Sequence, residues 1–222
     1  MFLPLSLPSS CSWYLVPENR LLWRFVPRRL EAEALRDATL AAAGTLNTRM
    51  YGPGFKPPIA VEAMQARNVK SPYPRDVEDR PENRRRSVYL FHKRVVQYPL
   101  MQAFDAPDAQ VSCGRRTNTT VAPQALALLN DPFVRLRAEE MSSRLEAECG
   151  ENPEARVRRA FQLTLARNPE ADELTAACAF VAEQAASRQQ RAGEANAEQA
   201  ERTAWTDFCQ ALFGLNEFIY VD

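Results

Sequence analysis

The chain has 222 residues, enough for one large domain or two small ones whose core needs no disulfide or metal to hold it. It carries 28 Lys and Arg residues and 28 Asp and Glu residues, so no overall charge attracts nucleic acid or an anionic membrane surface. The five cysteines include neither a CxxC nor a CxxCH motif. This excludes the usual zinc-ribbon and thioredoxin signatures and a covalently attached c-type haem within this chain.

Residues 1–17 are expected to form a disordered leader outside the folded domain. The stretch MFLPLSLPSSCSWYLVP is apolar but contains no Lys or Arg, and Pro4 and Pro8 interrupt it. It lacks the basic start of a signal peptide and is too short to span a bilayer. Residues 18–222 are expected to form a single helical domain, and the chain is interpreted as starting within a longer parent gene.

The pattern between Asn19 and Leu46 is helical, and Gly44 is a suitable stop for the helix. Its buried face is predicted from small and apolar residues at helical spacing: Leu30, Ala34, Ala38 and Ala41. Residues 48–85 are predicted to form a long loop, because six of the 16 prolines fall there and proline removes a backbone donor. Such a loop is either functional or mobile.

A small β element is predicted near residues 86–96, where β-branched and aromatic residues suit a half-buried strand. It is expected to pair with part of the proline-rich loop. Residues 98–104 are predicted to form a short helical turn, with Pro99 near its start.

Residues 120–213 are predicted to form a helical bundle. Three Asx-Pro pairs each combine an N-cap residue with a proline at the first helical position: Asp131-Pro132, Asn152-Pro153 and Asn168-Pro169. The predicted helices cover residues 120–130, 132–148, 153–167, 169–191 and 195–213, with a bend at Gly193. Apolar residues in the tail 215–222 are expected to dock against the core. The predicted fold class is mainly α, with at most a small β element.

Charge is uneven between Arg84 and Arg116, where seven Lys and Arg residues against two Asp residues give a local net charge of +5. Such a patch either holds an anion such as phosphate or sulfate, or pairs with acidic residues of the later helices. His92 is the single histidine, so a histidine-rich metal site is excluded, and a strand-surface position is the favoured interpretation. No catalytic residue is assigned and no metal site is expected.

The loop between Phe104 and the helix predicted at 120 holds the candidate ligand-binding residues: Asp105, Asp108, Arg115, Arg116, Asn118, Thr120 and Gln124. Arginines form bidentate hydrogen bonds with oxyanions, and helix N-termini attract anions, so a sulfated or uronic sugar is a chemically sensible ligand. The alternative is a capping loop in which the aspartates stabilise turns and pair with the arginines. Both interpretations stay open from the sequence.

Four segments in order resemble domain of unknown function 1553, the C-terminal domain of large Planctomycete cytochrome-c-associated proteins. They are RRSVYLFHKR, FDAPDAQVSCGRRTNTTVAPQALALLNDPFV, RVRRAFQLTLARNPEADEL and DFCQALFGLNEFIYVD. The stretch ENRLLWRFVPRRLEAEALRDATLAAAGTL is similar to an earlier part of the domain. The resemblance therefore spans residues 18–222 and leaves out the first 17.

The resemblance implies a parent protein that is exported and carries c-type haem only in a segment preceding this domain. It implies the other domains of that parent as partners, but no established activity. Two functions follow: a non-catalytic scaffold or binding module, or a domain of a polysaccharide-acting enzyme that uses Asp105, Asp108 and the loop of Arg115 and Arg116. The first predicts a stability loss on Asp105→Ala and Arg115→Ala; the second predicts that these side chains converge on one pocket. Neither nucleic-acid binding nor a membrane span is expected.

Overall fold

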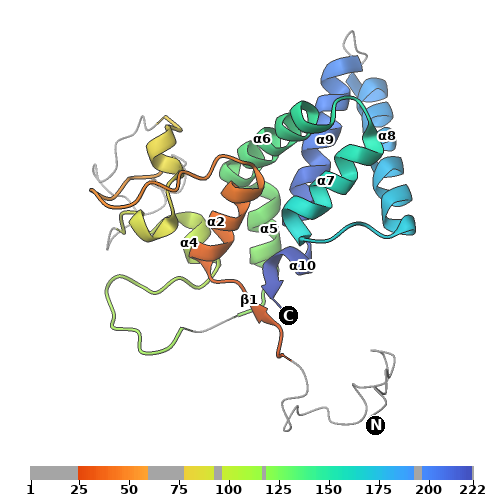
Figure 1. Cartoon of the computed structure of the whole chain (residues 1–222). Coiled ribbons are helices and arrows are strands. Elements are labelled where there is room, and N and C mark those ends of the chain that lie inside the picture. The colour runs from red at the N-terminus through yellow and green to blue at the C-terminus, as the bar shows by residue number, and fades with distance from the viewer. Residues whose placement is uncertain (1–24, 60–77, 93–96, 117–118, 193–196, 222) are drawn as a thin grey trace, which may run out of the picture.

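The computed structural model describes residues 25–59, 78–92, 97–116, 119–192 and 197–221 (Figure 1). Within that part of the chain the protein is mainly helical, with only a small two-stranded antiparallel sheet. Its elements in chain order are β1 (Arg28–Arg29), α2 (Ala32–Ala42), the 3-10 helices η1 (Pro81–Arg84) and η2 (Ser87–Tyr89), α4 (Pro99–Ala103), α5 (Ala122–Asn130), α6 (Pro132–Cys149), α7 (Pro153–Leu165), α8 (Ala171–Ala192), α9 (Ala197–Phe213), α10 (Asn216–Ile219) and β2 (Tyr220–Val221). The predicted mainly-α fold class is confirmed. The leader at residues 1–17 and the bend at Gly193 lie outside the described residues.

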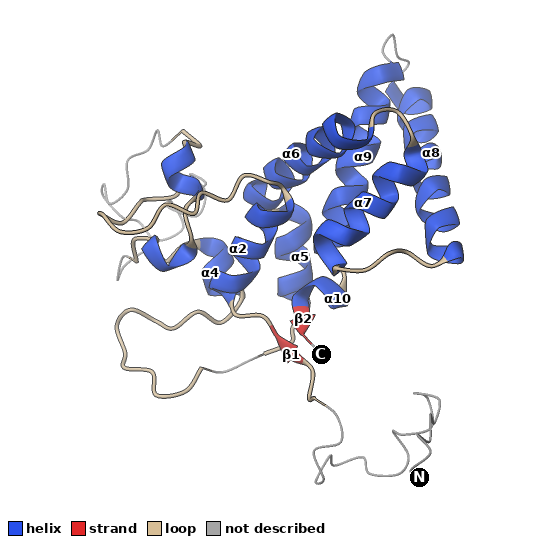
Figure 2. Ribbon diagram, in the orientation of Figure 1, coloured by secondary structure: helices blue, strands red, loops and turns tan. Residues whose placement is uncertain are grey.

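The four long helices of the C-terminal half form the predicted bundle. Helix α9 packs against both α6 and α8, and α7 also contacts α6 and α8 (Figure 2). Each helix buries apolar residues spaced three or four apart, which removes one face from water. On α6 the buried residues include Val134, Met141 and Leu145, and on α9 they include Phe208 and Leu212. These residues recur at the spacing of a buried helical stripe, as the predicted bundle requires.

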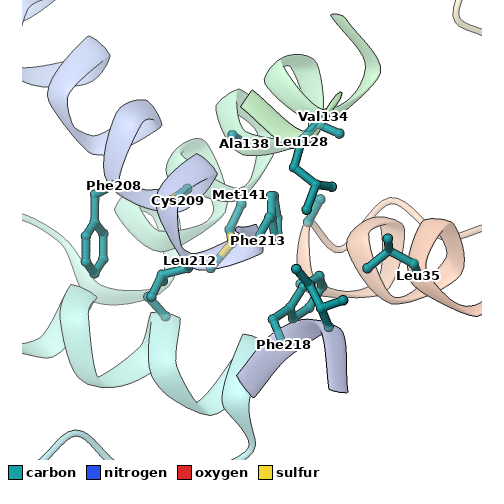
Figure 3. Packing of buried hydrophobic residues seen from close by; sticks show 14 of the residues in the cluster. Leu35, Leu128, Val134, Ala138, Met141, Phe208, Cys209, Leu212, Phe213 and Phe218 are labelled. Atoms are coloured by element: carbon teal, nitrogen blue, oxygen red, sulfur yellow. The ribbon is translucent and has the colours of Figure 1, made fainter. Parts of the chain in front are cut away.

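The core extends from the bundle to α2, α5 and α10. Figure 3 shows Leu35 of α2, Leu128 of α5 and Phe213 of α9 around one shared cluster. The tail joins it through Phe218 and Ile219, which are both buried, and the rings of Phe213 and Phe218 lie 5.3 Å apart. The predicted docking of the tail is therefore confirmed.

The two-stranded sheet joins the two ends of the described chain. Arg28 of β1 pairs with Val221 of β2, and Arg29 pairs with Tyr220, in antiparallel register. Next to it the backbone N–H of Leu30 donates to the carbonyl of Ile219 at 2.7 Å. Two-residue strands at opposite ends of a sequence leave no local periodicity, so the sequence did not predict them.

The prediction of a strand near residues 86–96 is wrong for residues 86–92, the part of that stretch that the structure describes. Residues Ser87–Tyr89 form a 3-10 turn, and only a single parallel bridge joins Leu90 to Phe55. Phe55 lies in the proline-rich segment, so the predicted pairing partner is right although the strand is not. Residues 93–96 lie outside the described part.

Helix α2 buries a face that overlaps the predicted one only in part, since Leu30 and Ala38 are partly buried against the core. Ala34 and Ala41 are exposed, whereas Leu35, Arg36 and Leu40 are almost fully buried. The prediction followed the small residues of the helix, whereas the structure buries the neighbouring face that carries the larger side chains. The predicted stop is confirmed, because Gly44 follows the helix at a φ of +76°, a left-handed conformation that glycine adopts without strain.

Two of the three predicted Asx caps are present. The Asp131 carboxylate accepts from the backbone N–H of Phe133 at 2.8 Å, and the Asn152 amide oxygen accepts from that of Ala155 at 3.2 Å. The third is wrong, since α8 begins at Ala171 and Asn168 accepts a hydrogen bond from the Gln162 side chain instead. The Glu173 carboxylate takes its place by accepting from the backbone N–H of Glu170 at 2.8 Å, which is half of a capping box.

The two asparagines make a matched pair for testing this difference. We expect Asn152→Ala to lower the free energy of unfolding by about 1 kcal/mol, because the first turn of α7 loses its side-chain acceptor. Asn168→Ala removes only an exposed side-chain hydrogen bond and is expected to have a much smaller effect. Urea denaturation followed by circular dichroism measures both. Equal losses for the two variants would contradict this assignment of the caps.

Candidate functional site

Asp105 lies just after α4 and joins three segments of the chain. Its carboxylate accepts from Nη2 of Arg29 at 2.8 Å and from both the backbone N–H and the hydroxyl of Thr119, each at 2.8 Å. The buried Arg29 side chain also donates to the carbonyls of Thr119 and Phe104, at 2.9 and 3.2 Å. Partial burial raises the pKa of Asp105, but the hydrogen bonds from Thr119 and Arg29 outweigh burial and hold the pKa below its ordinary value.

The two neighbouring arginines of the predicted site behave differently. Nη1 and Nη2 of Arg116 bind the two carboxylate oxygens of Glu33 at 2.7 and 3.0 Å, and Nη1 also lies 3.1 Å from Glu31. Burial raises the pKa of Glu33, but its contacts with Arg116 outweigh burial and lower the pKa overall. Arg115 is exposed, and its backbone carbonyl accepts from the Cys113 thiol at 3.2 Å, whereas no ion pair of its guanidinium is found in the described part of the chain. Arg116 therefore attaches the loop to the first turn of α2.

The remaining predicted residues divide between this network and the solvent. The Thr120 hydroxyl lies 2.9 Å from the hydroxyl of Tyr220 on β2, and the buried Gln124 amide donates to the Thr119 hydroxyl at 3.3 Å. Asp108 is exposed and accepts from the backbone N–H of Gln110 at 3.0 Å, as in the turn interpretation. His92 is exposed, and Asn118 lies outside the described residues. Ligand binding by these residues stays a prediction.

The basic stretch after the proline-rich loop is paired as well. Arg84 contacts Asp79 at 2.8 Å and Glu140 of α6 at 3.0 Å, and Arg86 lies 4.0 Å from Asp37. The expected pairing with a later helix therefore holds for Arg84. Lys93 and Arg94 of the same stretch lie outside the described residues.

A cavity of about 540 Å³ lies where α2, the segment 57–59, the residues around η1, the start of α4 and the start of α6 meet. Prolines and the rings of Tyr98 and Phe133 form much of its wall. Four charged side chains also line it: Arg36, Asp79, Asp131 and Arg137. The size suits a small ligand, and a mostly apolar wall with a few polar groups is typical of ligand sites. The sequence did not predict this cavity.

Two of these charges are buried arginines, each only 1% exposed. Arg36 donates to the carbonyls of Arg85 and Asn83, at 3.1 and 2.6 Å. Arg137 forms an ion pair with Asp79, and both guanidinium groups lie close to the ring of Phe133, at 5.2 and 5.4 Å from its centroid. These contacts offset the cost of removing the charges from water.

Asp131 is the acidic group of this cavity with a shifted pKa. Burial raises its pKa, and the hydrogen bond from the Phe133 N–H only partly opposes that rise. Burial and the nearby Asp131 charge also raise the pKa of Tyr98. A carboxyl group with a raised pKa in a cleft is a common mark of a functional residue. The sequence suggested only a cap at Asp131.

A periodic signal for the buried arginines was present in the sequence. Arg36 lies four residues from both Ala32 and Leu40, which are buried, and Arg137 lies between Val134 and Met141 on the buried stripe of α6. Periodicity places these residues inward, but an arginine on such a stripe is ordinarily taken as a solvent-exposed exception. Among the described residues there is no cluster of three or more potential metal ligands, and no helix there is long and apolar enough to cross a membrane.

Asp131→Asn should stabilise the protein at neutral pH. The raised pKa means that ionised Asp131 costs more in the folded state than in the unfolded state, whose pKa is 3.8. Wild-type stability is therefore lost as the pH rises through the folded-state pKa, while asparagine still caps α6 and carries no charge. Urea unfolding at pH 7 and at pH 3 should show a gain at pH 7 that shrinks at pH 3. Asp131→Ala, which removes the cap, is expected to lower the free energy of unfolding. If Asp131→Asn also lowers it at pH 7, the expected gain from removing the charge is contradicted.

Comparison with known proteins places the chain in a family. A family model described as "Protein of unknown function (DUF1553)" matches residues 9–181, while no curated protein and no solved structure matches. The match starts at residue 9, so the expectation that all of residues 1–17 lie outside the resemblance is wrong. It ends within α8, so the similarity of α9 and the tail rests on the sequence motif alone. The chain belongs to the DUF1553 family of proteins of unknown function.

Proposed function

We propose that this chain is a non-catalytic helical module that scaffolds or binds within a larger protein. One observation carries the proposal: polar residues of the 105–124 loop form hydrogen bonds with one another and with both ends of the described chain. Asp105 binds Arg29 and Thr119, and Thr120 binds Tyr220. A carboxylate whose oxygens already accept from two internal partners is poorly placed to act on a substrate.

The family resemblance supports a wider context for the module. In this proposal the parent protein is an exported, cytochrome-c-associated protein of the Planctomycete type, and this chain is its C-terminal domain. The haem lies in a preceding segment, so this chain itself needs no cofactor. Its partners are then the other domains of the parent protein or a polysaccharide or other anionic ligand.

A domain of a polysaccharide-acting enzyme is the second candidate. It requires Asp105 and Asp108 to act together beside Arg115 and Arg116. Asp105 faces Arg29, whereas Asp108 accepts from Gln110 within its own turn, so their contacts favour two separate structural roles. We therefore place this candidate second.

Alanine variants of Asp105, Arg116 and Arg115 test whether the loop has a structural role. We expect Asp105→Ala to lower the free energy of unfolding by about 2 kcal/mol, because the buried Arg29 loses its counter-charge. Arg116→Ala should cost about 1 kcal/mol, while the exposed Arg115→Ala should change stability by less than about 0.5 kcal/mol. This places the loss at Arg116 and not at Arg115. Urea denaturation at pH 7 measures all three variants.

The pH dependence sharpens this test. Because the pKa of Asp105 is lowered from 3.8 by folding, its contribution is present above pH 3.8 and is lost as the pH falls through the folded-state pKa. The difference between wild type and Asp105→Ala should therefore shrink in acid. An unchanged free energy of unfolding in both Asp105→Ala and Arg116→Ala would contradict the scaffold role. Polysaccharide cleavage by the wild type that Asp105→Asn abolishes would favour the enzyme.

A further inference from the structure

A second cavity, of about 650 Å³, lies between the loop after α2 and η1. Figure 1 shows this loop, in orange, beside the yellow segment that contains η1 and η2, at one edge of the molecule. Four cationic side chains line the cavity, Arg49, Lys56, Arg80 and Arg85, together with the acidic Glu82. We call this cavity the basic loop pocket.

The basic loop pocket has an excess of positive charge. Among the described residues, four cations minus one anion leave +3 on its wall, and counting Glu78, which lies 3.5 Å from Arg80 outside the wall, still leaves +2. The protein as a whole has no net charge, so this excess is local. The ion pairs Arg49–Glu82 and Arg80–Glu78 join side chains that are all more than half exposed. Such pairs are weak, and a bound anion competes with them readily.

The loop that forms this pocket is held rigidly by one buried side chain. Arg85 is 3% exposed and donates to three loop carbonyls, those of Arg49 at 3.2 Å, Tyr51 at 2.5 Å and Pro53 at 2.9 Å. The guanidinium lies 4.0 Å from the ring centroid of Tyr89, whose hydroxyl accepts from the Tyr51 N–H at 2.7 Å. The loop carbonyls therefore face a fixed cation.

The tip of the loop has a strained conformation. Tyr51 has a φ of +66°, which is unfavourable for an aromatic residue, and Gly52 follows at +87°. Gly54 passes so close to η2 that an added Cβ would lie 3.0 Å from the Tyr89 carbonyl oxygen. The Tyr51 side chain is nevertheless 79% exposed at the pocket wall. Strained backbone that presents an exposed aromatic ring on a clamped loop is typical of binding loops.

We propose that the basic loop pocket binds an oxyanion (phosphate, sulfate or carboxylate) carried on a ring that stacks on Tyr51. Arg80 and Lys56 supply charge-assisted hydrogen bonds to the oxyanion. The Tyr51 ring supplies a flat apolar surface for the ligand ring. This proposal names a ligand class for the binding role in the proposed function. It uses none of the residues of the Asp105 network, so the two fail in separate experiments.

Small probes in about 20 mM salt, where charge screening is weak, test the proposal on the full chain. The anions are phenyl phosphate, phenyl sulfate, benzoate and inorganic phosphate, and benzyl alcohol is the neutral probe. Backbone amide NMR shifts of the segment 49–56 report binding. We expect at least one ring-bearing anion to bind saturably and about tenfold more tightly than inorganic phosphate, and benzyl alcohol not to bind. Comparison of the three ring-bearing anions identifies which oxyanion is preferred.

Exposed side chains allow variants that preserve the fold. The double variant Lys56→Gln/Arg80→Gln should raise the dissociation constant of the ring-bearing anion at least about tenfold, because two charged donors are lost. Tyr51→Ala should weaken the ring-bearing anion down to the level of inorganic phosphate and leave inorganic phosphate unchanged. Arg158→Gln is the control, since Arg158 is half exposed and forms an ion pair with Glu154, far along the chain from the pocket. Melting temperatures confirm folding of each variant.

Three outcomes would overturn the proposal. The first is no saturable shift with any of the ring-bearing anions. The second is an equal loss in Arg158→Gln, which would show attraction by diffuse surface charge only. The third is tighter binding of a single-stranded DNA oligonucleotide than of every ring-bearing anion, with steep salt dependence, which would indicate a nucleic-acid surface.

Discussion

Buried arginine side chains hold together the loop-rich N-terminal half of this protein, and Arg137 of α6 joins that half to the helical bundle through Asp79. Arg36 of α2 and Arg85, which follows η1, are nearly inaccessible, and both donate to backbone carbonyls of neighbouring loop segments. The Asn83 carbonyl lies near the end of the short η1 and the Pro53 carbonyl in an irregular loop, so burial would otherwise leave both without donors. A planar guanidinium carries five N–H groups in fixed directions, which allows one side chain to satisfy several carbonyls. The hydrogen bonds in turn offset the cost of burying each charge.

The same chemistry joins the two ends of the described chain. Arg29 on β1 reaches Asp105 and the Thr119 carbonyl, while β1 itself pairs with β2 at the C-terminal end. The polar loop that the sequence marks as a site is thus the place where chain ends, α2 and α5 meet. Residues that suit ligand binding by their chemistry also suit this internal role, because the same hydrogen bonds serve both. The contacts of Asp105 with Arg29 and of Arg116 with Glu33 favour the internal role.

The two cavities border the arginine-held segments but differ in charge. The cavity around Asp131 has two arginines and two aspartates among the described residues of its wall, so these charges balance, and burial shifts the Asp131 pKa upward. The basic loop pocket carries an excess of cations on an exposed, strained loop. A charge-balanced, mostly apolar cavity suits a neutral group, whereas a cationic and open one suits an anion. The proposed binding module therefore has two chemically distinct cavities.

Local signals in the sequence determined the helical bundle, the caps at Asp131 and Asn152 and the helix stop at Gly44, because capping and periodicity act over a few residues. The prediction of a cap at Asn168 was wrong, because the side chain of Glu173 accepts the hydrogen bond from the backbone N–H of Glu170 at the start of α8. Periodicity aligns Arg36 with Ala32 and Leu40, but tertiary contacts decided that this face of α2 is buried, since an arginine turns inward only when carbonyls from other segments receive it. They also decided the pairing of β1 with β2 and both cavities. Each of these depends on groups far apart in the chain, whose meeting no short stretch of sequence encodes.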